Sequence, residues 1–172
     1  DRAYQPYVPN DPSLEYATTS SGYLGHRFTG ELRDTAANNV LLQWPIDTDT
    51  WQWSDDDAVF EQFGVTRQMM VELQMPGEVI GLVTIDAAAL TGIPVGVPVV
   101  ATANDKAVEM LSAGSLGESL VLISLGTYIA AMVHGHENHQ HPANFWTNFA
   151  CAPNRYLYES NGVRRVMWTL TW

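Results

Sequence analysis

The chain has 172 residues, of which 46% are apolar and 16% charged, and it is long enough to bury about 70% of its unfolded surface, which excludes wholesale disorder. Its formal net charge of −11 repels polyanions, and because the sequence contains no local basic patch, we expect no binding to nucleic acid. Cys151 is the only cysteine, which excludes an intrachain disulfide framework and suits a reducing cytoplasm.

The ends of the sequence and its longest apolar run bear on localisation. Residues 120–133 are mostly apolar but fall short of the roughly 20 residues that span a bilayer, so we interpret them as a buried strand pair and expect no membrane association. The N-terminus has neither the basic region nor the apolar segment of a signal peptide. Because the chain starts without Met and stops on the apolar residues 168–172, we expect a fragment.

The first half of the chain predicts short helices. Prolines in the first twelve residues predict extended backbone, with order from about residue 13. Apolar spacing over residues 13–28 predicts a helix that ends before Gly30. Asp34 is expected to cap a second short helix over residues 34–42, and Ser54, followed by three aspartates, is expected to cap a helix reaching about residue 63.

The second half alternates short strands with short helices. Thr66 predicts the cap of a helical turn through residue 73, and Pro76-Gly77 predicts a turn. The elements expected after this turn are a strand over 78–83, a helix over 85–90 ended by Gly92, a buried strand over 97–101, a helix over 105–111 ended near Gly114, and paired strands over 120–125 and 129–133. This alternation predicts an α/β fold with helices on the faces of a sheet.

Asn104-Asp105-Lys106 is the first candidate site. It lies where an apolar strand gives way to a helix, and ligands of open α/β sheets bind beyond the carboxyl ends of strands. Lys106 is the only lysine, and no other Lys or Arg occurs between Arg67 and Arg155, so a carboxylate and an isolated cation would suit a polar or phosphorylated ligand. In the alternative interpretation, Asp105 only caps its helix and Lys106 points to water.

Ser124-Leu125-Gly126-Thr127 is the second candidate site, with Gly126 and Thr127 as its phosphate-binding residues. A glycine and a hydroxyl between two apolar strands allow backbone N–H groups to approach a phosphate. Glycine and threonine are also ordinary in such turns, and the sequence contains no Walker-type loop and no GxGxxG.

Two further features have structural alternatives. Residues 134–141 (HGHENHQH) contain four histidines and could bind a metal, but they lack HExxH geometry, so we interpret them as a solvated loop and expect no native metal site. The six tryptophans could stack on sugars, although aromatic side chains serve more often as core.

Taken in order, several segments resemble the FGGY carbohydrate kinases, which include xylulose, ribulose, rhamnulose and glycerol kinases. Residues 23–31 (YLGHRFTGE) resemble the family pattern YLxxxLTGE, and Asp34 matches its continuation. Gly81 with residues 87–99 (AAALTGIPVGVPV) resembles GxxxxxAAxxTGLxxGtPV. Asp105, with Gly114 downstream, matches the family's gxxD, and Gly126-Thr127 matches its GTs.

The resemblance implies the ribonuclease-H-like, actin-like ATPase fold, with two α/β domains about a cleft. Residues 1–116 would be the later part of the first domain and residues 117–172 the beginning of the second. It implies a kinase that uses ATP and Mg²⁺ on a sugar or polyol, with Asp105 as general base at the mouth of the interdomain crevice. It also implies that Asn104 and Lys106 contact the substrate and that Gly126 and Thr127 face the ATP phosphates.

Departures from the family pattern keep other functions open. The family's DxGTxxxR segment and its later glycine-rich adenosine segment do not occur in these residues, so we expect the chain alone to be inactive, and Tyr128 stands where the family has a small hydroxyl residue. A non-catalytic sugar-sensing module and a metal protein built on the histidines are the alternatives. The sequence does not identify the sugar or the oligomeric state, and a homodimer is one possibility.

Overall fold

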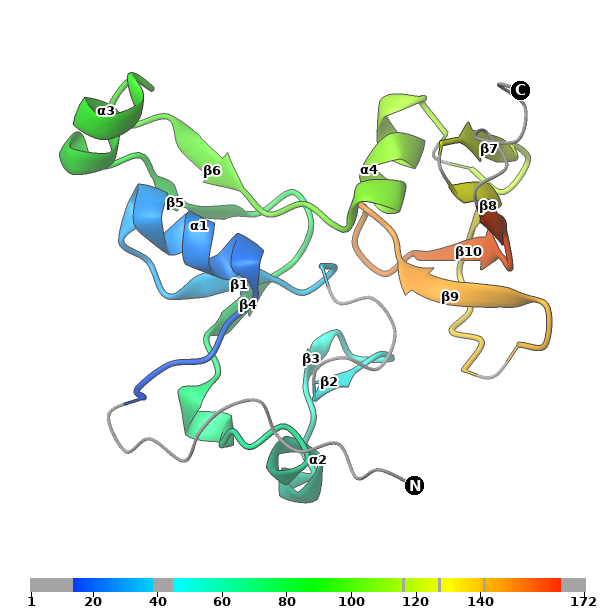
Figure 1. The fold of residues 1–172 in the computed structure, drawn as a ribbon, viewed down its shortest axis with the longest axis horizontal. Helices are drawn as coiled ribbons and strands as arrows, with labels where there is room; N and C mark the ends of the chain where they lie inside the picture. The colour runs from blue at the N-terminus through cyan, green and yellow to red at the C-terminus, as the bar shows by residue number, and fades with distance from the viewer. Residues whose placement is uncertain (1–13, 39–44, 116, 127, 141, 165–172) are drawn as a thin grey trace. The chain divides into compact units, whose positions relative to one another are not determined.

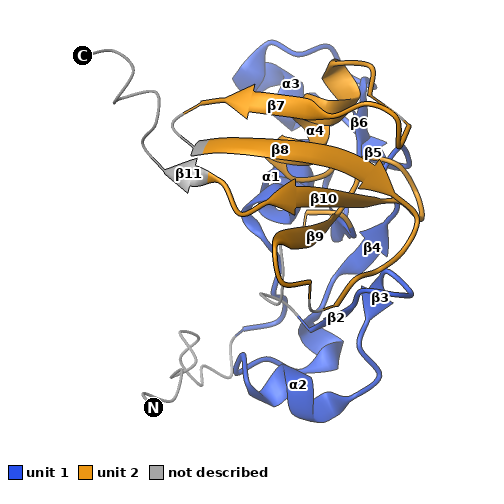
Figure 2. Ribbon diagram, turned by 90° about the vertical axis from the view of Figure 1, so that its right-hand side faces the viewer, with its two compact units in different colours: residues 1–36, 42–101 blue, residues 37–41, 102–172 orange. Residues whose placement is uncertain are grey.

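The structure is a computed structural model that describes residues 14–38, 45–115, 117–126, 128–140 and 142–164. It is a mixed α/β chain (Figure 1) that divides into two compact units (Figure 2). Unit 1 comprises residues 1–36 and 42–101, and unit 2 comprises residues 37–41 and 102–172. Among the described residues, no helix is both long enough and apolar enough to cross a bilayer.

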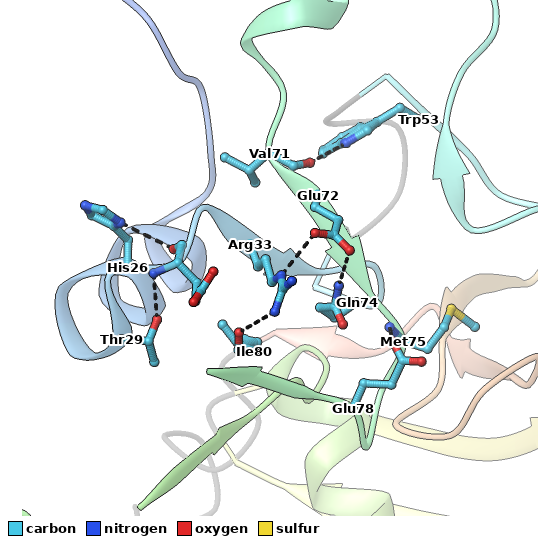
Figure 3. A network of polar contacts seen from close by, with 11 residues as sticks. His26, Thr29, Arg33, Trp53, Val71, Glu72, Gln74, Met75, Glu78 and Ile80 are labelled. Carbon is cyan, nitrogen blue, oxygen red and sulfur yellow. Dashed lines mark hydrogen bonds and ion pairs between the residues drawn. The ribbon is translucent and has the colours of Figure 1, made fainter. Parts of the chain in front are cut away.

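Unit 1 consists of short elements paired in two-stranded sheets. In chain order they are α1 (Ser20–Thr29), β1 (Arg33–Thr35), β2 (Ile46–Asp47), β3 (Gln52–Trp53), α2 (Asp57–Glu61), the 3₁₀ turn η1 (Arg67–Met69), β4 (Glu72–Gln74), β5 (Val79–Leu82), α3 (Ile85–Thr91) and β6 (Pro98–Val100). β1 pairs with β4 in parallel, whereas β2 with β3 and β5 with β6 are antiparallel. The Arg33 side chain joins β1, β4 and β5, since its Nε lies 3.0 Å from Glu72 Oε2 and its Nη1 donates to the Ile80 carbonyl (Figure 3).

The first predicted helix is confirmed at its end but begins later than expected. α1 starts at Ser20 rather than near residue 13 and ends at Thr29, before Gly30, whose φ of 79° is left-handed. A glycine takes this conformation without the steric cost that a Cβ would add, which is why the sequence marks this end well.

The helix predicted from Asp34 is wrong in the part that the structure describes, because Asp34 lies in the strand β1. Its buried carboxylate accepts hydrogen bonds from the hydroxyls of Thr18, Thr19 and Ser21 and from the backbone N–H groups of Thr19 and Thr35. The Asp34 carboxylate therefore does not cap a helix that follows it. It accepts hydrogen bonds from residues at the start of α1, which lie earlier in the chain. Residues 39–42 of the prediction lie outside the described residues.

The acidic helix start is confirmed with a different cap. α2 is capped by Asp56, whose side chain accepts a hydrogen bond from the Ala58 N–H. Ser54, the predicted cap, accepts a hydrogen bond from the Asp56 N–H, before the helix begins. The helix ends at Glu61, two residues before the predicted end. Thr66 does cap a helical turn, η1, but that turn ends at Met69 and gives way to β4.

The elements predicted after Pro76-Gly77 are confirmed in order: β5, α3, β6, α4 (Asp105–Ser112), β7 (Leu122–Leu125) and β8 (Tyr128–Gly135). Gly77, Gly92 and Gly114 all have positive φ at the predicted turn and helix ends. The strand over 97–101 is not buried in this chain, because Val100 in β6 is 43% exposed. β7 is likewise exposed on one face, with Ile123 58% exposed.

Unit 2 contains a five-stranded antiparallel sheet on which α4 packs. β9 (Phe145–Phe149) pairs with β10 (Tyr156–Ser160), β10 with β8, and β8 with both β7 and the short β11 (Val163–Arg164). The core between helix and sheet consists of Ala107 and Met110 from α4, Met132 from β8 and Leu157 from β10. Because Ala107 and Met110 face the sheet, the opposite side of α4, which carries the exposed Asp105 and Glu109, is accessible to a ligand.

Candidate functional site

Asp105 opens helix α4. Asn104 is the N-cap, and its Oδ1 accepts from the Ala107 N–H at 3.1 Å. Asp105 is therefore not needed as the cap, and its exposed carboxylate accepts only the N–H of Lys106, at 2.8 Å, among the described hydrogen bonds. The packed face of α4 is formed by Ala107 and Met110 instead. The carboxylate thus stays available to a ligand, next to the positive end of the helix dipole.

Lys106 does not point to water. Its ammonium group lies 3.0 Å from Glu109 Oε2, one turn along α4, and donates to Ser124 Oγ in β7 at 2.8 Å. The Lys106 side chain is 18% exposed, compared with 45% for Glu109. This geometry is incompatible with the alternative in which Lys106 is solvated, and it fixes the ammonium group between Glu109 and Ser124.

An open hollow of about 660 Å³ lies between α4 and β7. Its lining is mostly apolar, and the side chains able to bind a polar ligand are those of Asp105, Glu109, Ser112 and Ser124. The complete lining is Asp105, Val108, Glu109, Ser112, Ala113, Leu122, Ile123 and Ser124.

Glu159 in β10 is electrostatically coupled to this group. Burial raises the pKa of Glu159, the carboxylates of Asp105 and Glu109 raise it further, and the Lys106 ammonium lowers it. Asn148 in β9 donates to Glu159 Oε2 at 3.1 Å, which also favours the charged form. Three carboxylates and one ammonium group therefore act on one another around the start of α4.

Two buried amide atoms near this group have no hydrogen-bond partner among the described residues. They are Asn104 Nδ2, in a side chain whose residue is 7% exposed, and Asn148 Oδ1, in a residue that is 5% exposed. Because an unsatisfied buried polar atom costs free energy, each is a position where a water molecule or ligand would be stabilised.

Gly126 lies directly after β7 and is exposed. Ser124, whose hydroxyl contacts Lys106, is two residues before it in the strand. Thr127, the other predicted phosphate-binding residue, lies outside the described residues.

The histidine tract begins in a strand and continues as a loop over residues 136–140, so the solvated loop that its composition predicts is confirmed for the later part and wrong for the first two residues. His134 and Gly135 belong to β8, and His134 is 2% exposed. His136 Nε2 lies 3.2 Å from Glu118 Oε1, and the His139 ring packs against Tyr158. In the described ranges no three His, Cys, Asp or Glu side chains are placed to hold a metal ion, and His141 lies outside those ranges.

The tryptophans divide between core and surface. Trp51 is fully buried, and Trp53 donates its indole N–H to the Val71 carbonyl at 2.7 Å (Figure 3). Trp146 is 48% exposed and stands opposite Glu159 in the β9–β10 pair. Trp44, Trp168 and Trp172 lie outside the described residues.

Sequence reasoning found Asn104, Asp105 and Lys106 but missed the roles of Glu109, Ser124, Asn148 and Glu159. Glu109 could have been found, because a position three residues after Lys106 shares its helix face. The other three come from separate strands, and only the register of the sheet places them on the side that faces α4.

Comparison with protein families identifies residues 13–112 as a match to the N-terminal domain of the FGGY family of carbohydrate kinases. The uncharacterized sugar kinase YgcE of Escherichia coli K12 is 45% identical over 171 residues, which are 99% of this chain and 35% of that protein. L-fuculokinase of the same organism is 31% identical over 116 residues, covering 66% of this chain and 23% of that protein. The chain thus spans about a third of the first of these relatives and less of the second.

Solved structures share the fold. Xylulose kinase from Rhodospirillum rubrum superposes with a TM-score of 0.71 at 22% identity, over 88% of this chain and 30% of that one. Glycerol kinase from Plasmodium falciparum, determined with ADP, has a TM-score of 0.73 at 16% identity, over 90% of this chain and 31% of that one. These likenesses confirm the expected ribonuclease-H-like, actin-like fold in partial form.

Proposed function

The chain belongs to the FGGY family of carbohydrate kinases, and from this premise we propose that the whole protein is an ATP-dependent kinase that phosphorylates a hydroxyl of a sugar or polyol. Residues 1–116 are then the later part of its first domain and residues 117–172 the beginning of its second. The match of the family's N-terminal domain up to residue 112 supports this division. A cytoplasmic location fits both the use of ATP and the single cysteine.

The observation that carries the proposal is the exposed Asp105 carboxylate at the start of α4, which lines the hollow together with Glu109 and Ser124, the two partners of the Lys106 ammonium group. In the proposed reaction Asp105 accepts the proton of the acceptor hydroxyl while the hydroxyl oxygen forms a bond to the γ-phosphorus of ATP. The bond from that phosphorus to the bridging oxygen breaks, and ADP leaves.

The other site residues have supporting roles in this proposal. Asn104 and Lys106 bind the substrate, Asn104 through its unpartnered Nδ2 donor and Lys106 by exchanging one of its two contacts to the Glu109 carboxylate for a contact to the substrate. Gly126 and Thr127 bind the ATP phosphates at the end of β7.

Mg²⁺ accompanies ATP in reactions of this type and neutralises charge on its phosphates. The described residues offer no trio of carboxylate, histidine or cysteine ligands for such an ion. We therefore assign no Mg²⁺ ligand within them, and no step above depends on one.

Replacing Asp105 by Asn in the full-length protein tests the proposal. The rate of ADP release should fall at least about 100-fold, the contribution of a general base, while sugar binding by calorimetry stays within about threefold. Asp86→Asn is the matched control, because Asp86 is also an exposed carboxylate in the first turn of a helix, α3. Turnover of Asp105→Asn at the control's rate would contradict the base assignment.

The same assay separates the kinase from the alternative of a sugar-sensing module, which Tyr128 in place of a small hydroxyl residue favours. A panel of ketoses, aldoses and polyols is added to the full-length protein with MgATP. ADP release with one of them supports the kinase, whereas calorimetric sugar binding without ADP release from any supports the sensor.

A further inference from the structure

We propose that Ser124 is a positioning residue, whose hydroxyl holds the Lys106 ammonium group between Glu109 and β7, at the hollow that Asp105, Glu109 and Ser124 line. The inference deepens the proposed function and rests on it, since it gives Lys106 a fixed place at the substrate. Ser124 itself touches neither the substrate nor the reacting atoms in this proposal.

The contact joins two elements that are distant in sequence. Lys106 Nζ donates to Ser124 Oγ at 2.8 Å, across 18 positions of the chain, and to both carboxylate oxygens of Glu109 at 3.0 and 3.3 Å. A lysine side chain is long and flexible, so an ion pair with Glu109 on its own helix would by itself fix the ammonium group only weakly. The hydroxyl in β7 supplies a second, off-helix acceptor that fixes the direction of the side chain.

The place of Ser124 in β7 supports a specific role. In this strand, positions 122 and 124 are half-buried and positions 123 and 125 are exposed. Leu122 packs against the core cluster under α4, so an apolar residue would also suit position 124, one step further on the same side. A hydroxyl there leaves apolar packing unused and instead accepts a hydrogen bond from Lys106.

The charges around Lys106 explain why its position needs control. The carboxylates of Asp105 and Glu109 stand on the same helix, and Glu159 in β10 interacts with both of them and with Lys106. An ammonium group free to move could pair with any of the three carboxylates, whereas one bonded to Ser124 is kept between Glu109 and β7. Because β7 leads directly to Gly126, the same contact connects the substrate-binding lysine to the strand that carries the proposed phosphate-binding residues.

Steady-state kinetics of the full-length protein test the inference. Ser124→Ala should raise KM for the sugar about tenfold, the loss expected for a hydrogen bond to a charged group, and change kcat by less than about threefold. Ser124→Thr, which restores a hydroxyl, should return KM to near the wild-type value. Thr147→Val is the matched control, because it removes a half-buried strand hydroxyl whose partner is the His139 carbonyl, away from Lys106.

A double-mutant cycle with Lys106→Met separates positioning from a structural effect. If Ser124 acts through Lys106, then Lys106→Met raises KM by a similar factor and Ser124→Ala adds little in the double variant. The inference would be overturned if the increases in KM of the two single variants multiply in the double variant, or if Ser124→Ala leaves KM unchanged.

A chemical readout keeps the test independent of turnover. Acetic anhydride labelling followed by peptide mass spectrometry gives the acetylation rate at Lys106, which should rise severalfold in Ser124→Ala and not in Thr147→Val. An unchanged rate at Lys106 would also reject the proposal. Failure of the proposed function has a different signature, namely full turnover in Asp105→Asn, and it leaves the labelling result standing.

Discussion

The ring of Tyr158 lies against the backbone of Gly135, so closely that a Cβ atom on Gly135 would overlap the ring atoms Cε2 and Cζ and the hydroxyl oxygen. The phenol hydroxyl then donates to the Glu137 carbonyl at 2.8 Å and accepts from the Glu137 N–H at 3.1 Å. Tyr158 on β10 thereby fixes the course of the chain as it leaves β8. This contact explains why the start of the histidine tract is ordered strand rather than a solvated loop.

Gly135→Ala should lower the stability of the whole protein by about 1 to 3 kcal/mol, the usual cost of forcing extra volume into a packed site. Thermal and urea unfolding measure the change. Gly117→Ala is the control, because a Cβ there would have only Ser119 Oγ nearby, at 4.0 Å. Equal unfolding midpoints for the two variants would show that the Tyr158 ring moves aside freely.

Asp34→Ala should destabilise the protein by about 2 kcal/mol, since it leaves the half-buried hydroxyl donors at the start of α1 without their shared acceptor. Asp57→Ala, which removes an exposed ion pair with Arg67 at 3.1 Å, should cost less than about 1 kcal/mol. Urea denaturation compares the two. A loss at Asp34 no larger than that at Asp57 would mean that the hydroxyls of α1 find other partners.

Asn104→Ser and Asn104→Ala separate helix capping from substrate binding. Ser can still cap α4, so its variant should stay within about 0.5 kcal/mol of wild type, while Ala should lose about 1 kcal/mol. Both lose the Nδ2 donor, and therefore both should raise KM for the sugar. A wild-type KM in Asn104→Ser would exclude Asn104 as a substrate-binding residue.

Glu159→Gln should stabilise the protein in a pH-dependent way. Burial raises the pKa of Glu159 above its ordinary value of 4.5, so folding favours the protonated form. That contribution is fully present below pH 4.5 and is lost as the pH rises through the folded-state pKa. Gln resembles the protonated acid, so the two proteins should melt together in acid and diverge towards neutral pH, with the variant melting higher.

Melting curves from pH 4 to pH 8 check this, with Glu72→Gln as the control because Glu72 is an exposed carboxylate in β4. A pH-independent difference between Glu159→Gln and wild type would mean that Glu159 is charged at no extra cost.

The sequence predicts the ends of helices best where a glycine follows the helix. Gly30 and Gly92 take a positive φ directly after a helix and Gly114 does so two residues after one, a local requirement that the sequence shows by itself. Asp34 shows the opposite case. Its neighbours suggest a cap, but its carboxylate is used by residues 13 to 16 positions earlier, and this long-range competition leaves no local mark.

The residues of the candidate site likewise divide into those that the sequence indicates and those that only the folded structure shows. Asp105 and Lys106 stand out by composition and by the family resemblance, since they are adjacent in the chain. Ser124 and Glu159 do not stand out, because their connection to Lys106 depends on how two strands are paired. A serine in a strand is common, and only coordinates show that its hydroxyl accepts from the single lysine.

The pairing of β10 between β8 and β9 has an evolutionary consequence. Leu157 faces the helix in the core, and Glu159, two positions on, is on the same side, so one alignment of the strands sets both. Adding or deleting one residue in the β9–β10 turn, which the Ala150 N–H closes onto the Arg155 carbonyl, would rotate both side chains to the opposite face. Length changes in that turn should therefore be rarer among descendants of this sequence than substitutions within it.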